Sequence, residues 1–85
     1  MPSITIYTTE LCPYCARAKS LLKKKGAAFT EIDVSYDPDT RRAMAERAGG
    51  HRSVPQIFVG STHVGGCDEL HALDAVGKLD SLLAA

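Results

Sequence analysis

The sequence has no excess of charge of either sign and no long apolar run, and each absence removes a class of function. Ten basic and ten acidic residues give a formal net charge of zero, so no broad electrostatic field attracts nucleic acid or an anionic membrane. Nowhere do about 18 apolar residues follow one another, as a membrane-spanning helix requires. We therefore expect no nucleic-acid partner and no membrane partner, and partners chosen by local chemistry.

The sequence also lacks the marks of an exported protein. The first six residues contain neither the basic region nor the apolar stretch of a secretory leader. Three cysteines are an odd number, which argues against the paired disulfide framework of small secreted domains. We expect a cytoplasmic protein whose cysteines serve redox chemistry or metal binding.

The size of the chain suits one domain. Its 85 residues are 45% hydrophobic, enough for one core, and no linker, repeat or low-complexity stretch divides them. We expect residues 1–85 to form a single domain that acts as a monomer. Catalysis and binding must then share one surface.

The first half of the chain predicts a βαβ unit. Alternating β-branched residues over 3–8 are typical of a strand, and apolar residues at helical spacing over 13–25 are typical of a helix. Pro13 suits the first turn of that helix and Gly26 its end. A loose alternation over 27–34 predicts a second strand, parallel to the first through the helical crossover.

The second half predicts a helix, a hairpin and a last helix. Asp37 and Pro38 mark the start of a helix that runs to about residue 48. Short strands over 55–59 and 62–65 flank a turn and predict a β-hairpin. The last helix begins at about residue 67 and is interrupted at Gly77 before a final turn. The fold class is thus α/β, a four-stranded mixed sheet flanked by three helices in the order βαβαββα.

Apolar side chains in these elements predict the core. We expect Leu70, Leu73 and Val76 on the inner face of the last helix, and Leu79, Leu82 and Leu83 in the final turn. Other core residues are expected in the strands: Phe29, Ile32, Ile57 and Phe58.

Cys12 and Cys15 lie where the first strand passes into the first helix, and this position predicts thiol chemistry. A thiolate attacks disulfides, and the unpaired N–H groups and positive dipole end of a helix start stabilise negative charge on Cys12. Cys15 lies about one turn deeper, at a spacing from which the two sulfurs can approach disulfide geometry. We predict that Cys12 is the nucleophile and Cys15 the resolving thiol.

A zinc site is the alternative for two cysteines at this spacing. Zinc in proteins takes about four ligands, and no second Cys-x-x-Cys pair or closely spaced histidine pair exists to complete a site. The βαβ context favours the redox hypothesis, so we expect no metal. We interpret the three histidines as surface or packing residues: His51, His63 and His71.

Several segments closely resemble the dithiol glutaredoxins, particularly the small bacterial ones. They are Tyr7-Thr8, Cys12-Pro13-Tyr14-Cys15, Ala18-Lys19 with Leu21-Leu22, Ser53-Val54-Pro55-Gln56-Ile57-Phe58 and Gly65-Gly66-Cys67-Asp68-Glu69-Leu70. The resemblance covers essentially the whole chain. It implies a thioredoxin-like fold and a role in electron transport and cell redox homeostasis. It also implies an enzyme that reduces protein–glutathione mixed disulfides and protein disulfides, with glutathione as co-substrate and no tightly bound cofactor.

The resemblance further implies a glutathione site. Pro55 matches a cis proline that faces the cysteines, and the backbone of Val54 would pair with the cysteinyl part of glutathione. At the helix start after Gly66, the Cys67 N–H would receive the γ-glutamyl carboxylate, as exposed N–H groups there allow, and Asp68 would attract the amino group. Tyr14 either flanks this site or is simply a partly exposed ring.

One position departs from the family pattern. Relatives often carry a lysine for the glycine carboxylate of glutathione where this sequence has Thr9, so a charge-assisted bond is weakened to a hydroxyl contact at best. Arg52 is a candidate to compensate. Two other functions stay open: a redoxin reduced directly by a flavoprotein, and an iron–sulfur carrier that bridges two chains through Cys12 and glutathione. Pro13 and Cys15 count against the carrier.

Overall fold

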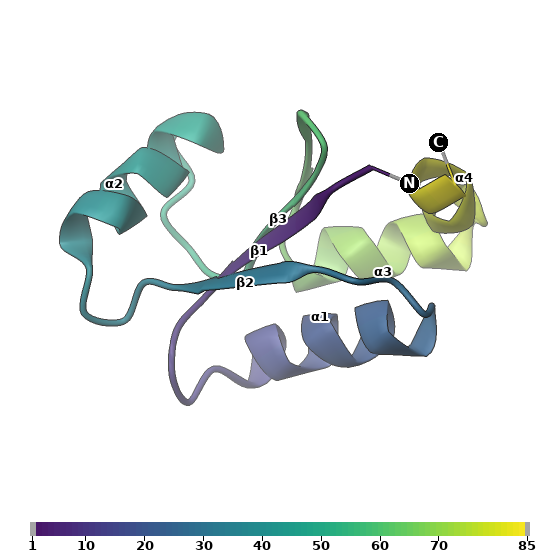
Figure 1. Cartoon of the computed structure of the whole chain (residues 1–85), viewed down its shortest axis with the longest axis horizontal. Coiled ribbons are helices and arrows are strands. Elements are labelled where there is room, and N and C mark those ends of the chain that lie inside the picture. The colour runs from purple at the N-terminus through teal and green to yellow at the C-terminus, as the bar shows by residue number, and fades with distance from the viewer. Residues whose placement is uncertain (1, 85) are drawn as a thin grey trace.

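Four strands form one mixed sheet in the spatial order β2-β1-β3-β4, which the computed structural model describes within residues 2–84 (Figure 1). β1 (Ile4–Thr8) is parallel to β2 (Thr30–Asp33) and antiparallel to β3 (Gln56–Val59). β3 pairs antiparallel with β4 (Thr62–Gly65) through the predicted hairpin. The predicted mixed sheet of four strands is confirmed.

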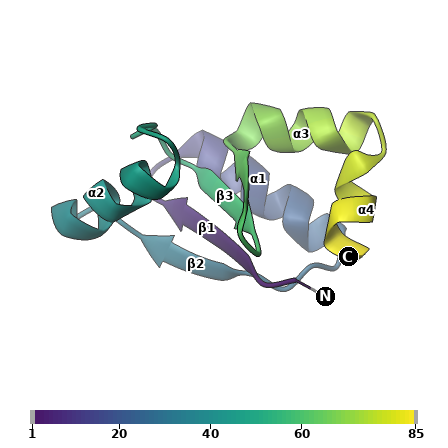
Figure 2. The same ribbon diagram turned by 90° about the horizontal axis from the view of Figure 1, so that it is seen from above.

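Helices cover both faces of this sheet. α1 (Pro13–Lys24) and α3 (Cys67–Ala75) lie side by side on one face, whereas α2 (Pro38–Arg47) lies on the other (Figures 1 and 2). α4 (Lys78–Ala84) packs against the end of α3. Lys25, at the end of α1, ties the three helices of this side together, because its Nζ lies 2.6 Å from Asp74 and 3.0 Å from Asp80.

The structure differs from the sequence prediction at the ends of elements. β2 covers only Thr30–Asp33 of the expected 27–34. The final turn is a helix of its own, so four helices flank the sheet instead of three. Gly77, at φ 76°, turns the chain between α3 and α4. The prediction that Val76 faces the core is wrong, since its side chain is 66% exposed. Because α3 ends at Ala75, Val76 does not continue the helical face that Leu70 and Leu73 form.

The core lies mainly between the sheet and the helices α1, α3 and α4. Leu70, Leu79, Leu83 and Ile57 are buried there as predicted. Phe29, Leu73 and Leu82 are half-buried and pack against this cluster, and Ile32 is also half-buried.

The opposite face of the sheet centres on Phe58, which is buried as predicted. The Arg47 guanidinium of α2 lies 4.0 Å from the centre of its ring, and the His63 ring stacks on it at 4.9 Å. Tyr7 meets the same ring edge-on at 5.8 Å. A cation and two aromatic rings around Phe58 therefore connect α2 to the sheet and strands β1 and β4 to β3.

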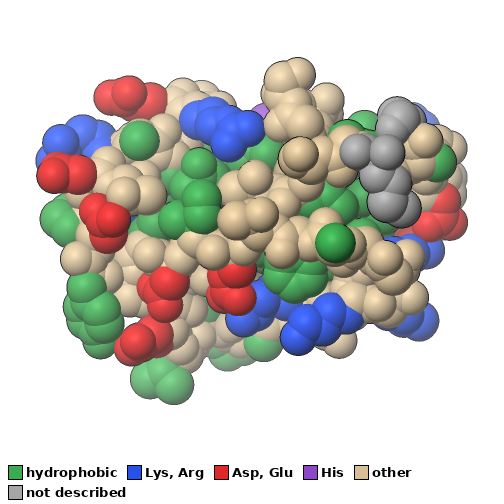
Figure 3. Space-filling model, in the orientation of Figure 1, with side chains coloured by type: hydrophobic (Ala, Val, Ile, Leu, Met, Phe, Trp, Pro, Cys, Tyr) green, Lys and Arg blue, Asp and Glu red, His purple; other side chains and the backbone are tan. Residues whose placement is uncertain are grey.

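The visible surface carries both signs of charge. Lysine, arginine and acidic side chains lie interspersed on the face drawn in Figure 3, without a continuous patch of one sign. In the described part of the chain, no helix has the length and apolar character needed to span a membrane.

Candidate functional site

Cys12 directly precedes the first residue of α1. After β1 the chain turns at Leu11, which has a positive φ of 53° and a fully exposed side chain. Cys12 is the N-cap residue of α1, and its Sγ accepts a hydrogen bond from the backbone N–H of Cys15 at 3.2 Å. The sulfur therefore takes the place that a serine or aspartate oxygen takes in other helices, beside the positive end of the helix dipole.

Cys15 lies one turn into α1 and is 2% exposed. Burial, and after it the neighbouring Cys12 thiol, raises the pKa of Cys15 from 9.0 to about 12. Cys12 is partly exposed, and both residues are free thiols. The two cysteines thus differ in access in the sense that the sequence predicted.

All six residues that were predicted to contact glutathione line one hollow of about 180 Å³. Ser53 and Glu69 complete its walls. The thiol of Cys12 lies next to this hollow without lining it, since Sγ donates to the Val54 carbonyl oxygen at 4.0 Å. The Val54-Pro55 peptide bond is cis, as the resemblance implied. The six residues come from the start of α1, the loop before β3 and the start of α3: Tyr14, Val54, Pro55, Gly66, Cys67 and Asp68.

The wall at the start of α3 is held by Glu69. Its carboxylate accepts a hydrogen bond from the Gly66 N–H at 2.8 Å. A side chain at Gly65 would not fit, because a Cβ there would lie 2.8 Å from the same carboxylate and φ is 114°. Asp68 and Glu69 place two acidic groups in the first turn, where they favour the helix dipole.

Cys67, the first residue of α3, is buried. Burial raises the pKa of its thiol, and its sulfur lies 3.4 Å from Nδ1 of His71, which is 2.8 Å from the Cys67 carbonyl oxygen. The thiol is therefore packed against His71.

A second groove, of about 570 Å³, is lined by Cys12 and Cys15 themselves. Thr9 lines this groove and does not line the hollow. Lys19 also lines it and is paired with Glu31 at 3.0 Å. The hydrogen bond from Thr8 to Glu31, with the Lys19 contact, lowers the pKa of Glu31.

The sequence prediction missed the residues that hold the loop before β3. Arg41 of α2 donates two hydrogen bonds to the Arg52 carbonyl oxygen, at 3.2 and 3.0 Å. Gln56 donates to the next carbonyl, that of Ser53, at 3.0 Å. Arg52 itself has an exposed side chain and does not line the hollow. The one sequence signal for Gln56 is that a polar residue stands next to the apolar residues of a predicted strand.

Within residues 2–84, no three histidine, cysteine or acidic side chains lie close enough together to hold a metal ion.

Comparisons with known proteins agree with the resemblance seen in the sequence. A family model described as Glutaredoxin matches residues 4–64. A glutaredoxin of Pseudomonas aeruginosa is 56% identical over 85 residues and is matched over 100% of both chains.

Two solved structures are similar over almost the whole chain. The solution structure of a glutaredoxin from Brucella melitensis is 60% identical, with a TM-score of 0.86 over 98% of this chain and 89% of that one. The crystal structure of a buckwheat glutaredoxin–glutathione complex is 31% identical, with a TM-score of 0.87 over 98% of this chain and 77% of that one. The thioredoxin-like fold predicted from the sequence is confirmed.

Proposed function

Since this chain belongs to the glutaredoxin family and is a thiol–disulfide oxidoreductase, we propose that it uses glutathione to reduce protein–glutathione mixed disulfides and protein disulfides. One observation carries the proposal. The six residues predicted to bind glutathione line a single hollow, and the sulfur at its border is the partly exposed one of Cys12. A similar structure, the buckwheat protein, is a complex with glutathione.

Cys12 is the proposed nucleophile. Its thiolate attacks the glutathione sulfur of the mixed disulfide, the sulfur–sulfur bond breaks, and the client leaves as a thiolate that takes up a proton. A second glutathione thiolate then attacks the Cys12–glutathione disulfide. This step releases oxidised glutathione and restores the Cys12 thiolate.

The proposed contacts follow the walls of the hollow. The Val54 backbone pairs with the cysteinyl part of glutathione beside Pro55. The γ-glutamyl carboxylate meets the Cys67 N–H at the start of α3, where a helix N-terminus favours an anion; the Gly66 N–H is already bonded to Glu69. Asp68 attracts the amino group. Tyr14, which is 55% exposed, flanks the bound tripeptide.

Cys15 is proposed to act only on protein disulfides. Attack by Cys12 on such a disulfide leaves the client tethered, and release requires an internal attack by Cys15 on Cys12, favoured by its high effective concentration. The deep burial of Cys15 keeps this thiol from reacting with clients directly. The two reactions therefore make different demands on the pair.

A pair of variants tests the assignment. Cys15→Ser should keep the reduction of a glutathionylated peptide, in an assay coupled to glutathione reductase, and should trap or slow the reduction of a protein disulfide. Cys12→Ser should lose both activities. A folded Cys15→Ser protein without either activity, or an active Cys12→Ser protein, would contradict the roles of nucleophile and resolving thiol.

The same assay distinguishes glutathione from a flavoprotein as the electron donor. Turnover with a thioredoxin-reductase-type flavoprotein alone, and none with glutathione and its reductase, would favour a redoxin that does not depend on glutathione. Visible absorbance after anaerobic reconstitution with iron and sulfide would instead favour the iron–sulfur carrier.

We also propose that one chain acts alone as a single domain. The walls of the hollow come from three separate parts of the chain, α1, the loop before β3 and α3, which one folded domain brings together. The cytoplasmic location predicted from the sequence stays a prediction.

A further inference from the structure

Gln56 does not line the glutathione hollow, yet its side chain holds the loop that does. We propose that Gln56 is a positioning residue, whose carboxamide fixes Ser53 and so presents the following Val54 peptide to glutathione. This inference rests on the proposed function. It adds to that function a residue that acts through the loop and touches neither glutathione nor the reacting sulfurs.

The carboxamide of Gln56 is fully engaged although it is buried. The residue is 3% exposed. Its Nε2 donates to the Ser53 carbonyl oxygen at 3.0 Å and lies 3.3 Å from the Ser53 hydroxyl. Its Oε1 lies 2.7 Å from Nε2 of His63. Because an unpaired buried amide costs free energy, these contacts fix the orientation of the side chain.

The backbone of Gln56 is anchored at the centre of the sheet. In the strand register it pairs with Tyr7 of β1. The side chain thus runs from a rigid strand back to a loop three residues earlier. A restraint from a strand to a loop is what a precise binding geometry requires.

The loop has few other restraints. Residues 49–53 form no regular helix or strand and are exposed, and the segment opens with two glycines. The Arg52 carbonyl is held by Arg41 and the next carbonyl, that of Ser53, by Gln56. Without the second restraint the loop would have to be ordered when glutathione binds, and that ordering weakens binding.

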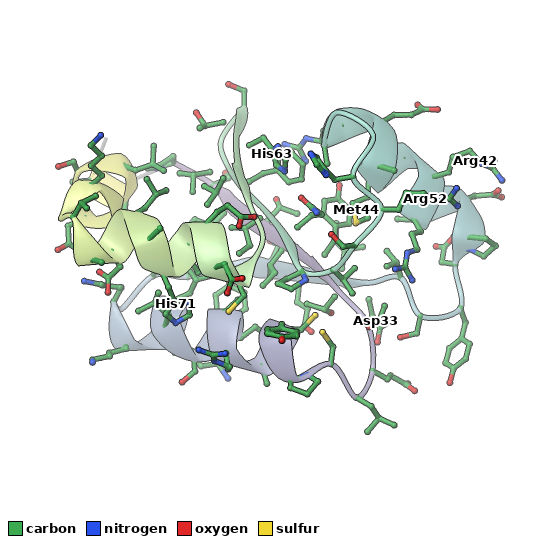
Figure 4. All side chains as sticks on the ribbon, turned by 180° about the vertical axis from the view of Figure 1, so that it is seen from behind. Asp33, Arg42, Met44, Arg52, His63 and His71 are labelled. Carbon is green, nitrogen blue, oxygen red and sulfur yellow. The ribbon has the colours of Figure 1, made fainter. Side chains whose placement is uncertain are left out.

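The Ser53 carbonyl determines which end of the Gln56 carboxamide faces the loop, because a carbonyl oxygen only accepts and Nε2 is the donor. With the amide reversed, Oε1 and the Ser53 carbonyl oxygen would face each other as two acceptors. Oε1 instead faces Nε2 of His63, whose ring stacks on Phe58 at 4.9 Å and lies beside the loop after α2 (Figure 4).

The test measures how firmly Cys12 holds a glutathionyl group. In a Cys15→Ser background, Cys12 thiol and oxidised glutathione exchange to the mixed disulfide and reduced glutathione, and the equilibrium constant is read by mass spectrometry in buffers of known glutathione ratio. Gln56→Met keeps the length of the side chain and removes its polar atoms. We expect the constant to fall about three- to tenfold, the range that corresponds to one net hydrogen bond.

Two further variants distinguish the donor from the acceptor. Gln56→Glu keeps an oxygen for His63 and loses the donor to Ser53 when ionised, so it should lower the constant at least as much as Gln56→Met. His63→Phe keeps a ring on Phe58 and leaves Gln56 able to donate, so its effect should be smaller. Retention of the full constant by Gln56→Glu would refute the role of the donor.

Lys25→Met is the matched control for a merely structural effect. It removes the ion pairs from Lys25 to Asp74 and Asp80, which lie at the opposite end of α1 from Cys12. We expect a lower melting temperature and an unchanged glutathionylation constant.

The outcomes separate the two proposals. If the Cys15→Ser background forms no mixed disulfide with glutathione, the proposed function fails whatever Gln56 does. If it does form one and Gln56→Met leaves the constant unchanged, the positioning role alone is wrong. If Lys25→Met lowers the constant in parallel with its melting temperature, Gln56 acts only through overall stability and the inference is overturned.

Discussion

Iodoacetamide at pH 8 should modify Cys12 in the reduced, folded protein and leave Cys15 almost untouched. Alkylation requires a thiolate that the reagent can reach. Burial raises the pKa of Cys15 to about 12, so about one molecule in ten thousand carries the Cys15 thiolate at pH 8. For a thiol at the ordinary value of 9.0 the fraction is about one in ten.

The folded state should therefore slow the alkylation of Cys15 by about a thousandfold relative to the unfolded chain, through the lower thiolate population alone. Its exposure of 2% slows the reaction further. Cys67 should be slow for the same two reasons, since it is 4% exposed and burial raises its pKa. Cys12 should react because its sulfur is partly exposed.

Mass spectrometry of proteolytic fragments after timed alkylation measures the three rates, and the same reaction in guanidinium chloride provides the unfolded reference. Cys15 in the folded protein reacting within tenfold of its unfolded rate would refute the reasoning. Such a result would mean that α1 opens readily, or that the small thiolate population of Cys15 does not limit its rate of alkylation.

Three further predictions concern charge. Burial favours the neutral Cys15 thiol in the fold, so the contribution of this thiol to stability is present below pH 9 and is lost as the pH rises towards 12. Between pH 9 and 11 the free energy of unfolding of the wild type should fall about 1.4 kcal/mol per pH unit more steeply than that of Cys15→Ala. Urea denaturation measures both free energies, and an equal pH dependence in the two proteins would contradict this. On the proposed function, the glycine carboxylate of glutathione extends past Cys12 into the groove that Thr9 lines, so Thr9→Lys should tighten glutathione binding by roughly 0.2 to 1 kcal/mol, less at high salt. An unchanged Michaelis constant for glutathione would refute this placement of the carboxylate. Lys25→Met should lower the melting temperature by removing the link from α1 to Asp74 and Asp80, and a melting temperature equally sensitive to salt in both proteins would count against that link.

The parts of the site that are close in sequence could be predicted from local rules. A proline in the first turn and two cysteines three residues apart predict a helix start with one outer and one inner thiol, and α1 has both. The approach of Val54 to Cys12 spans 42 residues. No spacing rule reaches so far, so this contact could be predicted only from the resemblance to a family.

Other features depend on tertiary packing and lay outside the reach of a pattern. Every residue of β3 is buried, because helices cover both faces of the central strands, and the strand shows no polar alternation that would indicate Gln56 as a partner of a loop. The exposure of Val76 follows from a helix end that periodicity does not locate. Thr9 illustrates a third limit, since a sequence does not tell on which side of the nucleophile a neighbouring side chain lies.

The N-cap role of Cys12 also affects the second half of the catalytic cycle. When glutathione attacks the mixed disulfide, the Cys12 sulfur is the leaving group, and a leaving sulfur departs faster when its thiolate is more stable. The N–H of Cys15, 3.2 Å away, binds a charged sulfur more strongly than a disulfide sulfur. The start of α1 therefore favours the departure of Cys12 as well as its attack, and a single backbone donor assists both bond formation and bond cleavage at the same atom.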